Sequence, residues 1–174
     1  MYRYRQEIAK DVDDLYSNDL RDCLNDICDI VEDIKKEFDI NKVIKANELY
    51  NENHDNIKKL YDLLEDLGSV VDEEYDDIEH IIDDWESEVH PNVAPYDDDT
   101  PDEVINSYDY EDNVKSYFDD VENAFDSIDI ITYNFDRNIW QDKLEETLDA
   151  FVDLIDKLEW GFNCKMLDWW NYNV

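Results

Sequence analysis

Residues 57–89 read IKKLYDLLEDLGSVVDEEYDDIEHIIDDWESEV, and their apolar side chains recur every three or four positions. This spacing puts the apolar side chains on one face of an α-helix and the charged ones on the opposite face. Gly68 stands where a left-handed C-terminal cap is favoured, so the sequence predicts a helix that ends there and a second helix capped by Ser69. The second helix is expected to end at His90-Pro91, because proline disfavours a helical residue before it.

Helical spacing extends through most of the rest of the chain. One long helix is expected over residues 18–38, where the apolar residues alternate at intervals of four and three. Thr100-Pro101-Asp102-Glu103 predicts another helix start, because it matches a capping box with proline at the first helical position. A last long helix is expected over residues 140–161, ended by Gly161, and the tail is expected to fold back as a short helix.

The chain has few residues that break helices: two glycines and three prolines. All three prolines lie within residues 91–101, which predicts a Pro- and Asp-rich linker between an N-terminal helical half, residues 1–90, and a C-terminal helical half, residues 102–174. A single continuous domain is the alternative. The sequence therefore predicts an all-α protein, a bundle of about five to seven amphipathic helices that is elongated or two-lobed. Residues 128–135 leave helix and short strand both open.

Charge is the most unusual property of the chain. Fifty acidic residues stand against fifteen basic ones, for a net charge of −35, whereas roughly 2 to 8 charges keep a small domain soluble. Self-repulsion on this scale opposes folding, so a functional benefit is expected. Disordered acidic tails lack aromatic residues, but this chain has 5 Trp, 12 Tyr and 6 Phe. The charge is therefore expected on a folded surface that attracts a basic nucleic-acid-binding protein and repels nucleic acid and anionic membranes.

The distribution of charge indicates where that partner binds. No lysine or arginine occurs from residue 60 to residue 114. Carboxylates three or four positions apart on a helix recur about every 5 to 6 Å, a spacing similar to that of phosphates along a nucleic-acid strand. A charge of −35 equals that of about 60 Å of duplex DNA. The predicted partner-binding residues are Asp72, Glu73, Glu74, Asp76, Asp77, Glu79, Asp83, Asp84, Glu86, Glu88, Asp97, Asp98, Asp99, Asp119 and Asp120.

No sequence pattern indicates an enzyme. Two glycines cannot build a P-loop or a dinucleotide-binding turn. In Asp97-Asp98-Asp99-Thr100-Pro101, proline stands where a calcium-binding loop would continue. His54-Asp55 has no earlier histidine to complete a metal-phosphohydrolase site, and Asp77-Ile78-Glu79-His80 lacks the second motif that a di-iron bundle needs. We therefore expect no catalytic residue, no metal site and no cofactor.

Cysteines and apolar runs bear on the compartment. Cys23, Cys28 and Cys164 form an odd set without a CxxC pair, so reduced thiols are expected and neither a disulfide framework nor a zinc site. No apolar run approaches the roughly 18 residues of a membrane span, and the first residues lack the apolar core of a signal peptide. A cytoplasmic location is therefore expected. Trp85 and Trp140 are expected in the core, whereas Trp169 and Trp170 either close it or form a homodimer contact.

In acidity, size, helical amphipathicity and aromatic content, the chain resembles virus-encoded DNA-mimic proteins of the anti-restriction and anti-CRISPR kind. The resemblance covers the whole chain but includes no specific motif, so it transfers no residue roles. It implies a protein in the cytoplasm of the host cell that inhibits a host defence enzyme, of the restriction or CRISPR effector type. The carboxylate array would occupy the nucleic-acid-binding surface of that enzyme.

Three other functions are compatible with the composition. An immunity protein or antitoxin that neutralises a basic nuclease toxin demands the same electrostatics, but it needs one local patch instead of a long array. Here the array extends past Asp119 to Asp129, which favours the mimic. The remaining two are a halophilic protein, acidic for solvation alone, and a magnesium-dependent helical enzyme.

Overall fold

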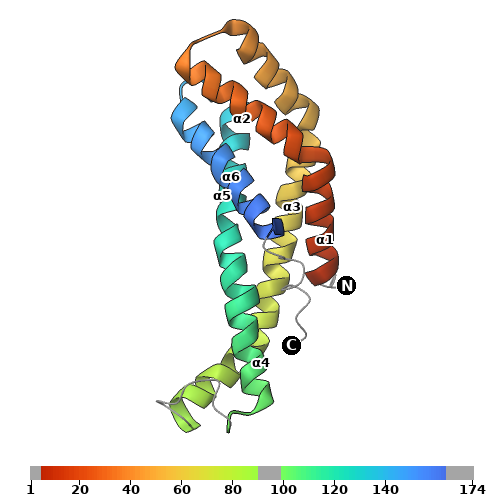
Figure 1. Cartoon of the computed structure of the whole chain (residues 1–174), viewed down its shortest axis with the longest axis vertical. Coiled ribbons are helices and arrows are strands. Elements are labelled where there is room, and N and C mark those ends of the chain that lie inside the picture. The colour runs from red at the N-terminus through yellow and green to blue at the C-terminus, as the bar shows by residue number, and fades with distance from the viewer. Residues whose placement is uncertain (1–4, 90–98, 164–174) are drawn as a thin grey trace.

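The structure is a computed structural model and describes residues 5–89 and 99–163. All regular secondary structure in these ranges is helical, which confirms the all-α prediction (Figure 1). Its four long helices are α2 (Arg21–Lys36), α3 (Ile40–Asp84), α5 (Ser116–Asp136) and α6 (Leu144–Asn163). Its shorter elements are α1 (Arg5–Leu15), α4 (Asp102–Tyr110) and the π-helical turns η1 (Tyr16–Leu20), η2 (Trp85–Val89) and η3 (Glu111–Lys115).

The helices form an elongated bundle around α3, which runs through most of the length of the molecule (Figure 1). α2 packs on the first part of α3, and α1 packs on the middle of α3, where Arg5 reaches Glu74. α5 packs along α3 in the opposite direction, and α6 packs between α2 and α5. α4 lies at the lower end in Figure 1, against the last turns of α3. The upper and lower parts of the molecule are thus joined by two long helices, α3 and α5.

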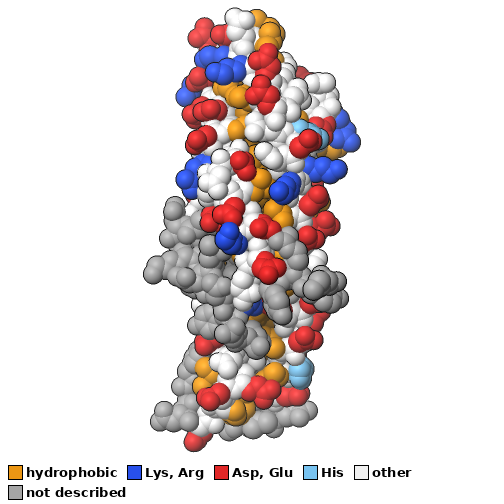
Figure 2. All heavy atoms as spheres, turned by 90° about the vertical axis from the view of Figure 1, so that its right-hand side faces the viewer, with side chains coloured by type: hydrophobic (Ala, Val, Ile, Leu, Met, Phe, Trp, Pro, Cys, Tyr) orange, Lys and Arg blue, Asp and Glu red, His pale blue; other side chains and the backbone are white. Residues whose placement is uncertain are grey.

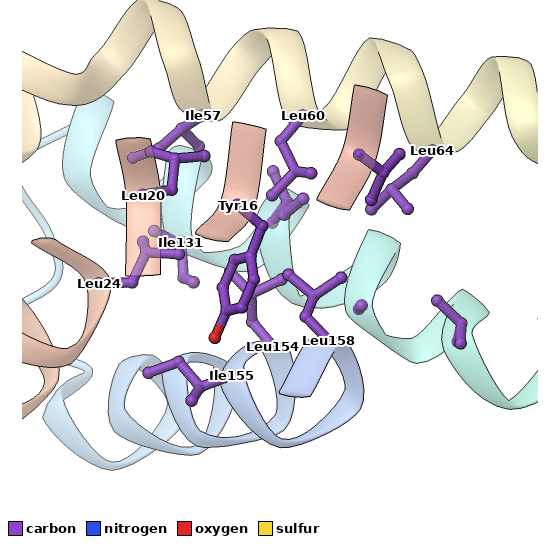
Figure 3. Packing of buried hydrophobic residues seen from close by; sticks show 14 of the residues in the cluster. Tyr16, Leu20, Leu24, Ile57, Leu60, Leu64, Ile131, Leu154, Ile155 and Leu158 are labelled. Carbon is purple, nitrogen blue, oxygen red and sulfur yellow. The ribbon is translucent and has the colours of Figure 1, made fainter. Parts of the chain in front are cut away.

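The main hydrophobic core takes side chains from α1, α2, α3, α5 and α6, and therefore from both sides of residues 91–101. Figure 3 shows Tyr16 of η1 reaching toward α6 among Leu20, Leu154 and Leu158. A smaller cluster at the lower end, made of Ile82, Trp85, Val104 and Tyr108, holds α4 against the end of α3. Trp85 and Trp140 are both buried, as predicted.

The predicted helix end at Gly68 is wrong, because α3 continues through Gly68 and Ser69 without interruption. Ser69 does not cap a helix, and its hydroxyl donates to the carbonyl of Glu65 one turn earlier, at 3.1 Å. Gly68 lies against Phe118 of α5, where an added Cβ would be only 2.8 Å from the Phe118 Cζ. The glycine therefore permits two helices to approach closely; it does not end one.

The helix predicted over residues 18–38 differs from the structure at both ends. The helical chain starts before residue 18, because α1 and η1 lead directly into α2. α2 ends at Lys36, with Lys35 and Lys36 in the last turn, where positive charge is favourable. Phe38, predicted on the apolar stripe, follows the helix and is 66% exposed. Asp39 then caps α3 by accepting a hydrogen bond from the Asn41 amide at 2.9 Å.

The predicted ends of the later helices agree with the structure in part. α4 begins at Asp102, so Pro101 is the N-cap residue and the helix starts one residue later than the predicted start at Pro101. The predicted capping hydrogen bond is absent, because the buried Thr100 hydroxyl has no partner among the described residues. Residues 128–135 are helical within α5, and α6 passes Gly161 to end at Asn163, so that glycine does not end the helix. Most of the predicted linker, together with the tail containing Cys164, Trp169 and Trp170, lies outside the described residues.

Candidate functional site

We call residues 60–89 and 99–122 the acidic arm; it occupies the lower half of the molecule in Figure 1. It comprises the second half of α3, η2, α4, η3 and the start of α5, and it contains one lysine or arginine, Lys115. The arm is held together because α4 and η3 pack on α3 with Tyr110 and Val114 fully buried. The arm is thus part of the folded bundle, because Tyr110 and Val114 belong to the main hydrophobic core.

Most of the predicted partner-binding residues lie at the surface of this arm. Exposed side chains belong to Asp72, Glu73, Asp76, Asp77, Glu79, Asp83, Asp84, Glu86, Asp99 and Asp119. Glu74 is half-buried. Asp97 and Asp98, and the side chains of Glu88 and Asp120, lie outside the described part of the structure. The exposed members that are described come from residues 72–84 of α3, from η2, from the turn before α4 and from the start of α5.

On the face shown in Figure 2, the lower end carries acidic side chains and one histidine, whereas lysines and arginines lie higher on the molecule. Between residues 73 and 84 of α3, six carboxylates form no ion pair with any described residue: Glu73, Asp76, Asp77, Glu79, Asp83 and Asp84. Carboxylates spaced by three and four residues on one helix are separated by about one turn, or roughly 5 Å along the axis. These six carboxylates form a row of uncompensated charge along the second half of α3.

Lys115 neutralises two of the predicted residues. Its ammonium group lies 2.9 Å from Asp72 Oδ1 and 2.8 Å from Asp119 Oδ1, and so joins α3 to α5. Burial lowers the pKa of Lys115, but the hydrogen bonds to Asp119 and Asp72 outweigh it and raise the pKa overall. Asp72 and Asp119 therefore hold the arm together in addition to contributing surface charge.

Glu74 also has a structural role. It accepts hydrogen bonds from the guanidinium of Arg5 and, at 2.8 Å, from the hydroxyl of Tyr110. Arg5 is only 2% exposed, and Tyr110 also donates to the carbonyl of Val71 at 3.2 Å. The cluster fastens the start of α1 and the end of α4 to α3. Glu74 therefore has a structural role in addition to the partner contact predicted for it.

Tyrosine hydroxyls bind carboxylates at several helix contacts, a feature that sequence analysis missed. In the arm, Tyr75 donates to Glu111 at 2.7 Å and Tyr108 donates to Glu86. Burial, followed by these hydrogen bonds, raises the pKa of both tyrosines well above its usual value, so each hydroxyl stays neutral at physiological pH. A neutral donor holds a carboxylate in place without cancelling its charge. No local pattern predicts such pairs, since the partners are 36 and 22 residues apart.

The residues weighed as metal or thiol sites lie elsewhere. In residues 5–89 and 99–163, no group of three or more His, Cys, Asp and Glu side chains is arranged to hold a metal ion. His54 contacts Asp55 at 3.6 Å and Asp136 at 3.5 Å at the surface. Cys23 and Cys28 are free and half-buried, and burial raises the pKa of each thiol to about 11. Among the described helices, none combines the length and apolar character that crossing a membrane requires.

No protein family, curated protein or solved structure matches the chain. The chemical character of the arm is clear from its own residues: carboxylates fixed on packed helices, anchored by neutral hydroxyls and one lysine. Such a surface can bind cationic groups through charge and hydrogen bonds.

Proposed function

We propose that this protein is a DNA-mimic inhibitor, whose carboxylate array occupies the nucleic-acid-binding surface of a host defence enzyme of the restriction or CRISPR effector type. One observation carries the proposal: the length of the molecule matches its charge. The 45 residues of α3 extend about 68 Å at 1.5 Å per residue. The net charge of −35 equals that of about 60 Å of duplex DNA. The protein therefore has nearly the linear charge density of the duplex.

The way the arm is built supports this proposal. Phosphates occupy fixed positions along DNA, so a mimic gains from carboxylates whose supporting helices do not move. Tyr75 and Tyr108 hold Glu111 and Glu86 of the arm while leaving their negative charge intact. A partner that neutralises phosphates with lysine and arginine would meet comparable charges here and would release counterions from them. The partner is thus a basic nucleic-acid-binding protein, and no catalytic group, metal or cofactor is required.

A second candidate is an immunity protein or antitoxin that neutralises a basic nuclease toxin. It is favoured by the position of the segment without lysine or arginine, residues 60–114, whose described part lies toward one end of the molecule. Toward the other end, lysines accompany the acidic residues, as in Lys35 with Glu145 and Lys42 with Asp33. A local acidic patch suffices for a toxin inhibitor, whereas a duplex mimic uses a longer array.

Capture from a bacterial lysate tests both candidates. The full chain is immobilised, partners are eluted by a salt step, and the capture is repeated with added duplex DNA. Mimicry predicts one nucleic-acid enzyme that duplex DNA displaces, whereas a DNA-insensitive toxin supports the second candidate. Absence of any salt-eluted partner contradicts both.

Two variants with equal charge loss locate the contact. D76N/D77N/D83N removes three exposed carboxylates from the arm, and D22N/D26N/D29N removes three exposed ones from α2. Binding to the captured partner should weaken strongly in the arm variant and slightly in the α2 variant. Equal weakening would show that net charge matters and the arm does not.

A further inference from the structure

A small pocket of about 170 Å³ opens between α3 and α5 inside the acidic arm. Its floor is apolar and includes Gly68, Phe118 and Phe125. Its rim is acidic, with Glu65 and Asp72 from α3 and Glu122 from α5. An apolar floor surrounded by carboxylates is absent from the surface of duplex DNA, so this pocket goes beyond charge imitation.

The floor is built by the close approach of the two helices. Phe118 is buried and packs so closely on Gly68 that a Cβ at position 68 would clash with its ring. Phe125 is half-buried and stacks on Tyr61, with ring centroids 4.2 Å apart and an interplanar angle of 25°. The aromatic groups are thus fixed by their own packing, and the pocket exists without a ligand to shape it.

The rim carries charge that the protein itself does not neutralise. Glu65 and Glu122 are exposed on opposite sides of the floor, and neither forms an ion pair with a described residue. Asp72 is already bound to Lys115 at 2.9 Å. Two unpaired carboxylates, one on each helix, are therefore available to bind a cationic group in the pocket.

The chemistry of the pocket selects a ligand with an apolar stem and a cationic end. Lysine and arginine both bury their methylene groups on apolar surfaces while keeping the charged end in a polar environment. Arginine fits better, because its planar guanidinium packs on aromatic rings and donates several hydrogen bonds in a fixed geometry to carboxylates. Glu65 and Glu122 can each accept from it, and Phe125 offers an aromatic surface beneath.

We infer that this pocket receives one arginine side chain of the protein partner, with its stem on Phe118 and Phe125 and its guanidinium between Glu65 and Glu122. The inference rests on the proposed function for the existence of a basic partner, but the binding chemistry is a property of the pocket itself. An arginine seated here would give the complex a specific register, which uniformly spaced charges alone do not provide.

The test uses the full isotope-labelled chain and three blocked tripeptides, acetyl-Gly-X-Gly-amide, with X as arginine, lysine or the neutral isostere citrulline. Binding is followed by amide chemical shifts in NMR titrations at fixed ionic strength. The arginine peptide should shift the amides of Gly68 and Ser69 and saturate at millimolar concentration. The lysine peptide should bind more weakly, and the citrulline peptide should not bind.

Variants separate the pocket from the general charge of the arm. E65Q/E122Q should raise the dissociation constant of the arginine peptide by about tenfold, or about 1.4 kcal/mol, which is the size expected for the loss of two solvent-exposed ion pairs. E73Q/E79Q removes equal charge from exposed positions of the same helix and should change it less than about twofold. Ser69→Leu narrows the pocket without changing charge and should also abolish binding.

Three results would overturn the inference: shifts spread evenly along the arm, equal affinity for the lysine peptide, or equal weakening by both charge variants. The outcome is independent of the lysate experiment. If the peptide fails to bind but duplex DNA still displaces a captured enzyme, only the arginine pocket is rejected. If the peptide binds as expected and no partner is captured, the proposed function falls and the pocket remains.

Discussion

We call the described residues outside the acidic arm, 5–59 and 123–163, the body of the molecule. The body and the arm use the same helical packing, but their carboxylates are bound by different groups. In the body, lysines pair with acidic residues, as in Lys36 with Glu32 at 3.1 Å and Lys143 with Glu146 at 3.2 Å. In the arm, the hydroxyls of Tyr75, Tyr108 and Tyr110 share this role with Lys115 and the buried Arg5. Tyrosine hydroxyls also bind carboxylates in the body, at Tyr16 with Glu159 and Tyr50 with Asp136, but there the lysine pairs are more numerous. A cation cancels the charge that it binds, whereas a hydroxyl does not. The arm thus gains cohesion and keeps its negative charge.

The largest expected effect on stability comes from removing a buried tryptophan, and it should differ between the main core and the smaller cluster at the lower end. Trp140 is fully buried in the main core, stacks on Phe135 and donates to Asn47 at 3.1 Å. Trp140→Ala should lower the free energy of unfolding by about 3 to 5 kcal/mol in urea titrations, because a large cavity remains. Trp85→Ala, in the smaller cluster of the arm, should lower the free energy of unfolding by less. It should loosen the packing of α4 while the body stays folded. Equal effects would mean that arm and body unfold as one unit.

Alkaline pH should weaken the arm through its tyrosines. The pKa values of Tyr75, Tyr108 and Tyr110 are raised in the folded state by burial and by hydrogen bonds to carboxylates, from an ordinary value of 10.0. The neutral form is therefore favoured by folding, so the stabilisation is complete below about pH 10 and is lost as pH rises above it. Circular dichroism against pH should show the loss, with ultraviolet absorbance following tyrosine ionisation.

The matched variants for this prediction are Y75F/Y108F and Tyr133→Phe. The double variant removes two hydroxyls bound to carboxylates and should flatten the alkaline transition. Tyr133 is exposed and stacks with Arg137, so its replacement should leave the transition unchanged. A transition that is the same in all three proteins would contradict a role for the tyrosine pairs.

Gly68→Ala tests the close contact within the arm. Alanine is the better helix former by about 1 kcal/mol. Its Cβ would press on Phe118, however, and overpacking costs about 1 to 3 kcal/mol, so a net loss of about 1 kcal/mol is expected. The neighbouring exposed Ser69→Ala should be neutral or slightly stabilising. Thermal unfolding of both variants gives the comparison, and a more stable G68A protein would show that Phe118 moves aside easily.

The smallest effect concerns single lysines. Lys115 is 22% exposed as a side chain and binds two carboxylates, whereas Lys36 is 68% exposed and binds one. Lys115→Met should lower the free energy of unfolding by about 0.5 to 1 kcal/mol. Lys36→Met should leave it almost unchanged, as is usual for exposed pairs. Low-salt thermal melts should reveal the difference most clearly, because salt screens both interactions. Equal costs would remove the distinction between arm and body at this position.

Much of the fold could be predicted because helical periodicity is a local signal. Residues 57–89 have the right spacing for a helix, and the motif at residues 100–103, which is also local, located the start of α4 to within one residue. The error at Gly68 has a physical origin: a glycine that ends a helix and a glycine that permits a contact look the same in sequence. Only the position of Phe118, fifty residues later, distinguishes them.

For the candidate site, the sequence by itself determined the charge, its sign and the segment without lysine or arginine, since these depend on residue identity alone. Only the tertiary structure decided which carboxylates remain uncompensated. It bound Glu74 to Arg5 and Tyr110, placed Asp72 beside Lys115, and left Asp76 and Asp77 at the surface. The physical reason is distance along the chain: hydrogen bonds and pockets join residues from separate helices, and periodicity within one helix carries no information about its neighbour.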